Sequence, residues 1–432
     1  MTLNIAKKRL FYRIKSVWSV LTTFFIYGLL TACSTVGVIL QTASKTPTAK
    51  TAQPSLSTLT SLTEWKNQKA DIRATLQDEI YGPYPATLGL QTLSVTQKGG
   101  LHFGNRAIIE HHRMAISAPT VQSAQLGQSN PFDLIVIKPP SSRQVQAPNP
   151  IPIIVMQSFC PVNDVIPEAG LPAPEGITFS CKNRGILRGL VSLFFGRYIR
   201  TPPIEDILDA GYGLAILYPP EFMPDSRKNG LAALAQFFAE TDNPSSYRAI
   251  STWAKQFSLI ANYLKSQSDF SHSILYGHSR YGKTALLALA FDENIDGAIA
   301  HQSGTGGASL SRDKPGETVE AITRQFPHWF SAKYSEDNIT YDQHYLIALA
   351  APRPILLGNA RRDVWSDPNG AYNAALAATP IYQLHSKNGL TQNNLGDFQP
   401  MADIAFWMRP GTHGVVKEDW PAFMEFLNAH FK

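Results

Sequence analysis

The segment Gly277–Lys283 (GHSRYGK) places a serine, Ser279, at a glycine-flanked turn. The apolar run at 272–276 predicts a buried strand before the turn, and residues 284–291 predict a helix packed against a sheet after it. This arrangement holds a serine on a strained backbone, with its hydroxyl at the top of the sheet and the next N–H available to an oxyanion. Such a serine is suited to nucleophilic attack on an acyl carbon. The alternative is a strand-to-helix turn that contains a serine by chance.

A serine hydroxyl needs a base within hydrogen-bond reach and a third group that orients the base. In sites of this kind the order along the chain is serine, acid, histidine. Asp363 follows a predicted strand at 354–358, and His413 lies in a glycine-flanked loop after a predicted strand at 403–409. Their joint placement predicts that Ser279, Asp363 and His413 form a catalytic triad.

Each of these assignments has a simpler competitor. Asp367 directly precedes Pro368 and is expected to cap the following helix rather than to orient the base. An isolated histidine in a loop is more often solvated than catalytic, and an isolated aspartate after a strand commonly forms a turn. Three other histidines compete for the role of base: His301, His344 and His385.

The composition is typical of one large α/β domain. The chain has 432 residues, of which 44% are hydrophobic and 16% charged, enough for a large core. Apolar runs at 90–96, 107–116 and 132–137 predict the antiparallel start of a mixed sheet. The aliphatic run at 151–156 predicts a strand buried on both faces, and another strand is predicted at 212–218. Strands and helices then alternate, which predicts a mostly parallel sheet covered by helices on both faces, a three-layer sandwich.

Helices are predicted at 63–81, 203–210, 251–264 and 418–431. Residues 157–160, directly after the aliphatic strand, are expected to supply further oxyanion N–H groups. The stretch from Cys160 to Pro203 is rich in proline and glycine and longer than an ordinary connection. We therefore expect it to be a surface insertion that helps to shape the pocket.

The N-terminus has the order of an export signal, in which basic residues precede an uncharged apolar stretch, here 16–32. The basic residues are Lys7, Lys8, Arg9, Arg13 and Lys15. The stretch runs into Leu30-Thr31-Ala32-Cys33-Ser34, which resembles the bacterial lipobox, where the cysteine becomes the lipidated first residue. We therefore expect lipidation at Cys33. The alternative is an uncleaved transmembrane anchor, for which the apolar stretch is short.

With this leader assigned, the chain is predicted to have three parts. They are an export signal with lipobox at 1–32, a flexible tether at 33–61 and a catalytic domain at 62–432. The domain is expected to lie in the bacterial cell envelope, anchored to the membrane by lipid. The five basic residues of the leader account for the whole formal charge of +5, so the mature chain has no basic excess that would indicate nucleic acid.

Cys160 and Cys181 are the cysteines that remain if Cys33 is acylated. In an oxidising compartment such a pair is expected to form a disulfide. Two buried free thiols are the alternative, because spacing in sequence does not give the separation of the Cα atoms.

The residues around the candidate triad resemble one family. Gly277–Lys283 is similar to the G-x-S-R-x-G-K signature of the glucuronoyl esterases, carbohydrate esterase family fifteen, especially its bacterial branch. The match includes Gly282, which stands one place later than in G-x-S-x-G. The resemblance spans the chain from about Trp65 to the end and implies an α/β-hydrolase fold. It continues through 303–312 (SGTGGASLSR), 316–318 (GET), 326–330 (FPHWF), 342–344 (DQH), 351–354 (APRP), 363–368 (DVWSDP) and 409–413 (RPGTH).

The resemblance implies that Ser279 is the nucleophile and His413 the base. It also implies that Arg280 adds a cationic donor to the oxyanion hole and that Lys283 contacts the sugar. A fixed guanidinium aimed at a developing oxyanion strengthens in the transition state, where such a donor contributes about 3–4 kcal/mol. Lys283 lies one helical turn after Ser279 and can reach the same pocket. The alternative for both cations is an ordinary charge at the start of a helix.

One position departs from the family pattern. Many members have the catalytic glutamate directly before the Ser-Gly-x-Gly-Gly run, where this chain has Gln302. A glutamine carries no charge that would stabilise an imidazolium, so the acid is assigned to Asp363, as in the branch that carries D-x-W-x-D-P. Gln302 is accordingly expected to be replaceable by alanine without a large loss of turnover. Trp365 is assigned to an apolar wall for the sugar and Glu317 to its hydroxyls, with core packing and a surface salt bridge as alternatives.

These features predict a serine esterase that attacks the ester between a uronic acid carboxyl group and an alcohol of plant or algal polysaccharide. No cofactor or metal is expected, because the adjacent His111 and His112 cannot both face one ion from a strand. The expected partners are a carbohydrate ester and a membrane, and the protein is expected to be a monomer. The alternatives are a carboxylesterase or acetylesterase of other specificity, and a catalytically silent carbohydrate-binding lipoprotein.

Overall fold

The computed structural model describes residues 52–118, 127–128, 131–140, 150–171, 173–174, 181 and 196–432. The predicted export signal, the predicted lipid site Cys33 and the tether up to residue 51 lie outside the described residues. Within the described part of the chain, no helix combines the length and the apolar character needed to cross a bilayer.

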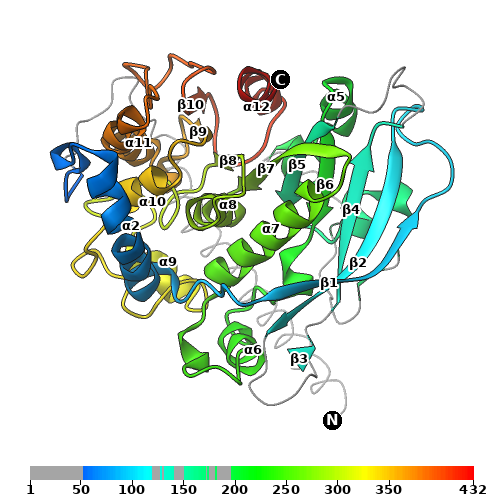
Figure 1. The fold of residues 1–432 in the computed structure, drawn as a ribbon, viewed down its shortest axis with the longest axis horizontal. Coiled ribbons are helices and arrows are strands. Elements are labelled where there is room, and N and C mark those ends of the chain that lie inside the picture. Colours follow the sequence, from blue (N-terminus) through cyan, green and yellow to red (C-terminus); the bar gives the residue numbers. More distant parts are fainter. Residues whose placement is uncertain are drawn as a thin grey trace, which may run out of the picture.

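A ten-stranded sheet built from the described residues forms the centre of the molecule (Figure 1). Its order is β1-β2-β4-β6-β5-β7-β8-β9-β10, with the short β3 paired to β2. Neighbours from β6 to β10 are parallel, whereas β1, β2 and β4 pair antiparallel. The strands are Gly89–Gln97 (β1), Ile108–Ala118 (β2), Gly127–Gln128 (β3), Phe132–Lys138 (β4), Ile151–Gln157 (β5), Gly213–Leu217 (β6), Phe270–His278 (β7), Gly297–His301 (β8), Ile355–Ala360 (β9) and Ile404–Arg409 (β10).

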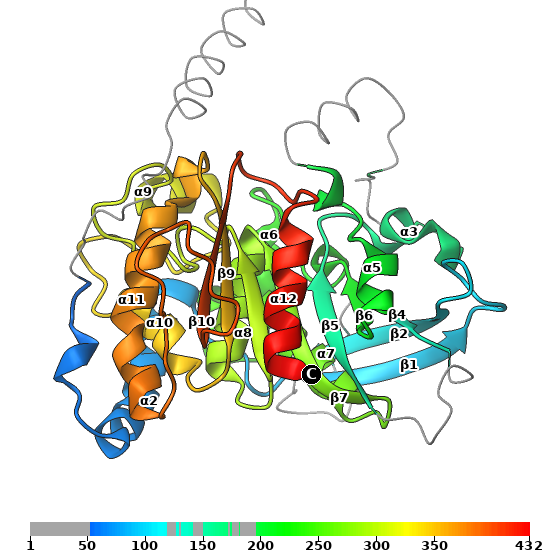
Figure 2. The same ribbon diagram turned by 90° about the horizontal axis from the view of Figure 1, so that it is seen from above.

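Helices cover both faces of this sheet (Figures 1 and 2). The α-helices are Leu62–Leu76 (α2), Val162–Val165 (α3), Ile204–Asp209 (α5), Gly230–Phe237 (α6), Ala249–Lys265 (α7), Arg280–Phe291 (α8), Val319–Gln325 (α9), Gln343–Leu349 (α10), Pro368–Leu384 (α11) and Asp419–Phe431 (α12). α2, α7, α8, α10 and α11 contribute to one hydrophobic core, and α3, α5 and α12 to the other.

Strand β5 explains why the sheet has two cores. All but the first of its residues are buried. Ile153 and Val155 belong to the core that contains α7 and α8, while Ile154 and Met156 belong to the core that contains α12. Because successive side chains in a strand point to opposite faces, a continuous aliphatic run is what a strand covered on both sides requires. The predicted three-layer α/β arrangement is confirmed, and its strand order and covering helices are those of an α/β-hydrolase fold.

The elements predicted from periodicity are present, with ends within a few residues of the prediction. The helix predicted at 63–81 continues from α2 through a π turn, Gln77–Tyr81, and ends at Gly82, whose φ is +69°. Strand β8 was not predicted. Its sequence, GAIAH, is short and contains a single β-branched residue, so it carries little strand propensity although all five residues are buried.

The predicted disulfide between Cys160 and Cys181 is present, with the Cα atoms 5.8 Å apart. The stretch 160–203 is only partly described. Its described portion includes α3 and a 3₁₀ turn, Arg197–Ile199.

Candidate active site

Ser279 lies between β7 and α8, with φ +56° and ψ −121°, a backbone conformation that costs a non-glycine residue free energy. The two flanking glycines make this turn possible. A Cβ at Gly277 would lie 1.9 Å from the carbonyl oxygen of Tyr281, and a Cβ at Gly282 would lie 3.0 Å from the Cβ of Ser303. The second glycine is therefore required at position 282 because the next strand's loop packs against the helix start there. This is the strand–serine–helix turn expected from the sequence.

Ser279, Gln302, Asp363 and His413 each follow one of four neighbouring parallel strands, β7, β8, β9 and β10. Parallel strands bring their carboxyl ends to the same edge of a sheet, which is where α/β proteins place their sites. Residues far apart in the sequence thus meet at one edge.

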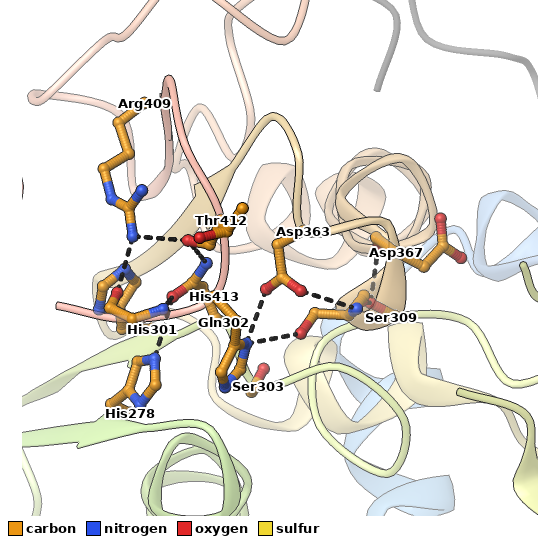
Figure 3. A network of polar contacts seen from close by, with 12 residues as sticks. His278, His301, Gln302, Ser303, Ser309, Asp363, Asp367, Arg409, Thr412 and His413 are labelled. Carbon is orange, nitrogen blue, oxygen red and sulfur yellow. Dashed lines mark hydrogen bonds and ion pairs between the residues drawn. The ribbon is translucent and has the colours of Figure 1, made fainter. Parts of the chain in front are cut away.

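Asp363 contacts His413 directly, since its Oδ2 lies 2.8 Å from His413 Nδ1 (Figure 3). The carboxyl group is buried, with the side chain 1% exposed. Burial acts to raise the pKa of Asp363, but the charge of His413 and hydrogen bonds from His413 and Ser366 outweigh it and hold the pKa below its usual value. Since Nδ1 is engaged, Nε2 is the nitrogen left to accept a proton. The geometry is that of an acid orienting a general base.

The loop that carries Asp363 is fixed by the loop that follows β8. Ser309 Oγ donates to the carbonyl oxygens of Ser366 and Asp367, at 2.6 and 2.9 Å. Gly304, with φ +59°, and Gly316, with φ +80°, let this loop approach closely, since Cβ atoms there would lie 3.3 and 2.5 Å from backbone atoms of residues 364–366. Packing of this density restricts the position of the carboxylate.

A cavity of about 830 Å³ opens at the same edge of the sheet. Of the residues singled out from the sequence, Ser279, Arg280, Lys283, Gln302, Glu317, Asp363, Trp365 and His413 all line it. Trp365 is 45% exposed, so it is a wall of the cavity rather than part of the core. Residues that were not singled out also line the cavity, among them Arg324, Phe326, Trp329 and Arg362.

Arg280 is held in place by contacts that the sequence did not predict. Its Nη1 forms an ion pair with Asp225, and its guanidinium lies 4.8 Å from the ring centre of Trp329 and 5.5 Å from that of Phe159. Its Nε is buried and has no hydrogen-bond partner among the described residues. Arg280 also lines the cavity, so its guanidinium is a cationic donor at the site. Asp225 itself accepts from His328 Nε2 and Trp329 Nε1, both at 2.8 Å.

Lys283 is 3% exposed, and its Nζ donates to the carbonyl oxygen of Ser303 at 2.5 Å. Burial lowers the pKa of this lysine to about 8, with the charge of Glu317 acting in the opposite direction. Lys283 therefore lines the cavity as a desolvated donor, with hydrogens left for a ligand.

The competing residues lie elsewhere. His301, His344 and His385 are not among the residues that line the cavity. His301 is fully buried, 3.6 Å from Asp419, and His344 contacts the carbonyl oxygen of Pro54 at 2.8 Å. Asp367 accepts from the N–H of Gly370 at 2.9 Å and caps α11, as predicted.

Residues 157–160 were expected to supply oxyanion N–H groups. None of residues 157–160 lines the cavity, and the N–H groups of Ser158 and Cys160 are used internally, on Leu217 O and Ser158 Oγ. This loop instead contributes the ring of Phe159, which packs on Arg280. The expectation that the stretch 160–203 shapes the pocket falls largely on residues 172, 175–180 and 182–195, which lie outside the described residues, and it stays a prediction.

No group of metal-binding side chains occurs among the described residues. His111 Nε2 contacts Asp133 at 2.8 Å, and His112 Nδ1 contacts the hydroxyl of Tyr263 at 2.9 Å. The two adjacent histidines thus use separate partners.

Comparison with known proteins gives a consistent result. The model of the fungal glucuronyl esterase family matches residues 215–385. Carbohydrate esterase MZ0003, from an unknown prokaryotic organism, is 36% identical over 239 residues, which are 52% of this chain and 55% of that protein. The chain thus spans about half the length of this curated relative.

Solved structures agree over a longer range. A family 15 esterase from a marine bacterial metagenome, described as promiscuous, is 28% identical with a TM-score of 0.71, over 86% of this chain and 93% of that one. The glucuronoyl esterase from Solibacter usitatus is also 28% identical, with a TM-score of 0.70, over 90% and 99%.

The fold and the serine turn at the carboxyl edge of its parallel strands define a member of the α/β-hydrolase superfamily. Within it, the chain is similar to the glucuronoyl esterases of carbohydrate esterase family 15.

Proposed function

We propose that this protein is a serine esterase that hydrolyses esters of 4-O-methyl-glucuronoyl type in plant or algal polysaccharide. The observation that carries the proposal is the convergence of Ser279, the Asp363–His413 pair and two cations on one cavity. The related proteins named as glucuronoyl esterases support the choice of acyl group.

The reaction follows from the placement of these groups. Ser279 Oγ attacks the ester carbonyl carbon while His413 Nε2 accepts its proton. The tetrahedral intermediate collapses, the carbon–oxygen bond to the alcohol breaks, and His413 returns the proton to the leaving oxygen. Water then attacks the acyl-enzyme with His413 again as base, which releases the uronic acid and restores Ser279.

Arg280 supports this reaction at the oxyanion. Negative charge develops on the carbonyl oxygen in each tetrahedral state, and a preorganised guanidinium stabilises it more than the neutral ester. Asp225 and the rings of Phe159 and Trp329 hold the guanidinium in place before the substrate arrives. No reorganisation is then needed as charge develops.

Substrate choice is assigned to Lys283, Glu317 and Trp365. A bound uronate ester carries no carboxylate charge, so Lys283 acts by hydrogen bonding to ring hydroxyls or a methoxy oxygen. A site with a buried donor discriminates against analogues that lack the acceptor, because the donor is then left unpaired. Trp365, at the exposed wall, supplies apolar area for the face of the sugar ring.

Comparing substrates on the purified protein tests this assignment. Methyl or benzyl glucuronate is expected to have a much higher kcat/KM than acetylated xylose or short aryl esters. Lys283→Ala should narrow the gap by weakening the uronate reaction alone. If the acetylated sugar is the better substrate, the protein is an acetylesterase or a general carboxylesterase, and the glucuronoyl assignment fails.

We also infer that the catalytic domain acts as a monomer at the bacterial cell envelope, held by a lipid on Cys33. Support comes from the basic and apolar order of the leader and from the lipobox-like residues before Cys33. The Cys160–Cys181 disulfide is compatible with an oxidising compartment. Cys33→Ser should release the full chain from the membrane fraction of a bacterial host. Equal membrane association of both forms would argue for a transmembrane anchor.

A further inference from the structure

Gln302 occupies the position directly after β8, between the strand that leads to Ser279 and the strand that leads to Asp363. It is 1% exposed, and its φ is +49°, a conformation that L residues rarely adopt. A large polar side chain in a strained, buried position needs an explanation from its contacts.

Its side-chain amide binds the backbone on both sides of His413 (Figure 3). Oε1 accepts the N–H of Gly414 at 2.8 Å, and Nε2 donates to the carbonyl oxygen of Thr412 at 3.3 Å. One amide thus pairs with the loop before and after the histidine, much as a neighbouring strand would.

His278 fixes the orientation of this amide. Its Nε2 lies 2.9 Å from Gln302 Oε1, and because Oε1 is an acceptor, Nε2 must carry the hydrogen. Burial, followed by the neighbouring charges of His413 and His301, holds the pKa of His278 well below its usual value, so the ring is neutral. The ring of His278 also packs against that of His413, with the centres 4.6 Å apart.

Arg409 holds the same loop through other atoms. Its Nη2 donates to the carbonyl oxygens of Thr412 and Gly414, at 2.9 and 2.7 Å, while its Nε binds Asp419 at 2.9 Å. Arg409 therefore donates to carbonyl groups of the loop. Gln302 accepts the N–H of Gly414, which an arginine cannot do because its side chain has no acceptor. The two side chains are complementary.

We propose that Gln302 is a positioning residue, which sets the backbone of residues 412–414 so that His413 meets both Asp363 and Ser279. The inference rests on the proposed function of His413 as the base. The imidazole is 27% exposed, so packing alone does not fix it, and the backbone that carries it must be held instead. The proposal differs from the expectation from the sequence that Gln302→Ala causes no large loss of turnover.

The test compares variants of the full-length protein. Gln302→Met keeps the volume and removes the two hydrogen bonds to the loop and the one with His278. Gln302→Ala removes the amide together with its volume and adds no carboxylate beside His413. Gln343→Met is the matched control, because Gln343 is a buried amide in α10 that accepts from the Tyr81 hydroxyl at 2.7 Å and does not line the cavity.

Two measurements are needed. The first is steady-state kinetics with methyl glucuronate, which gives kcat and KM, and the second is the rate at which a fluorophosphonate labels Ser279. Displacement of a catalytic group by about 1 Å costs on the order of 100-fold in rate. Both Gln302 variants should therefore lose about 10- to 100-fold in kcat and in labelling rate, while KM stays unchanged. Gln343→Met should lower Tm but not kcat per folded molecule.

The proposal is wrong if Gln302→Met keeps kcat and labelling within about twofold of the parent, or if its losses equal its loss of folded protein. Should Gln302→Met not fold, full activity of Gln302→Ala has the same meaning. A parent protein that is labelled but does not cleave methyl glucuronate would refute the proposed substrate, while the labelling rates would still decide the role of Gln302.

Discussion

At the scale of single residues, one side chain supplies the negative charge beside His413, and another binds the backbone of the loop that carries His413. Asp363 carries the negative charge next to His413, at 2.8 Å, and its pKa stays below the usual value because His413 and Ser366 outweigh its burial. Gln302 lies on the neighbouring strand end and is neutral. A second carboxylate there would compete with Asp363 for the imidazolium, whereas an amide has both an acceptor and a donor for the loop. On the proposed assignment, Asp363 orients and charges the imidazole, and Gln302 positions the backbone that carries it.

Asp363→Asn and Asp367→Asn test this assignment with the same chemical change four positions apart. Asp363→Asn removes the charge that stabilises the imidazolium and favours the wrong tautomer, so kcat should fall by about 10³- to 10⁴-fold. Asp367→Asn keeps a helix cap but removes the charge that faces buried Lys314 at 3.8 Å, so stability should fall while kcat per folded molecule stays close to the parent's. Steady-state kinetics and thermal unfolding separate the two. Similar small losses in kcat would mean that the acid lies elsewhere.

At the scale of elements, the sequence was sufficient where local rules apply. The serine turn, the aliphatic strand β5 and the cap at Asp367 are each determined by neighbouring residues, and each was predicted. Strand β8 was missed because Gly297, Ala298 and Ala300 have no β propensity of their own. They form a strand because β7 and β9 lie on either side.

The contacts of Gln302 and Asp225 were missed for a different reason. Asp225 lies in a loop between β6 and α6, over fifty residues from Arg280, and no periodicity or turn pattern marks it. Only the folded chain brings it to the guanidinium.

Asp225→Asn is expected to lower kcat about tenfold with little change in KM, because the oxyanion donor loses the charge that orients it. The amide oxygen can still accept from His328 and Trp329, so the loop should keep its place. Asp269→Asn is the matched control, since Asp269 pairs with Lys138 at 2.5 Å and does not line the cavity. Unchanged kcat in Asp225→Asn would show that the aromatic rings alone orient Arg280.

At the scale of the whole molecule, some buried titratable groups lower stability as the pH falls, and another lowers it as the pH rises. Burial, with some contribution from neighbouring charges, holds the pKa values of His278 and His301 well below 6.5, so the folded chain keeps them neutral. The unfolded chain binds these protons below about pH 6.5, and stability is lost as the pH falls through that range. Glu221 acts in the other direction.

Glu221 is 6% exposed, its Oε2 accepts from the N–H of Asp133 at 2.8 Å, and its Oε1 has no partner among the described residues. Burial raises the pKa of Glu221 to about 8, from a usual value of 4.5. The folded chain therefore keeps a proton that the unfolded chain has released, and stability falls as the pH rises from 4.5 to about 8.

Glu221→Gln has no proton to lose. Its unfolding free energy should match the parent's near pH 4.5 and exceed it increasingly towards pH 8, by at most roughly 4 kcal/mol. Denaturant unfolding across this range measures the difference, with the exposed Glu240→Gln as control. Parallel curves for parent and Glu221→Gln would mean that Glu221 is ionised in the folded protein throughout.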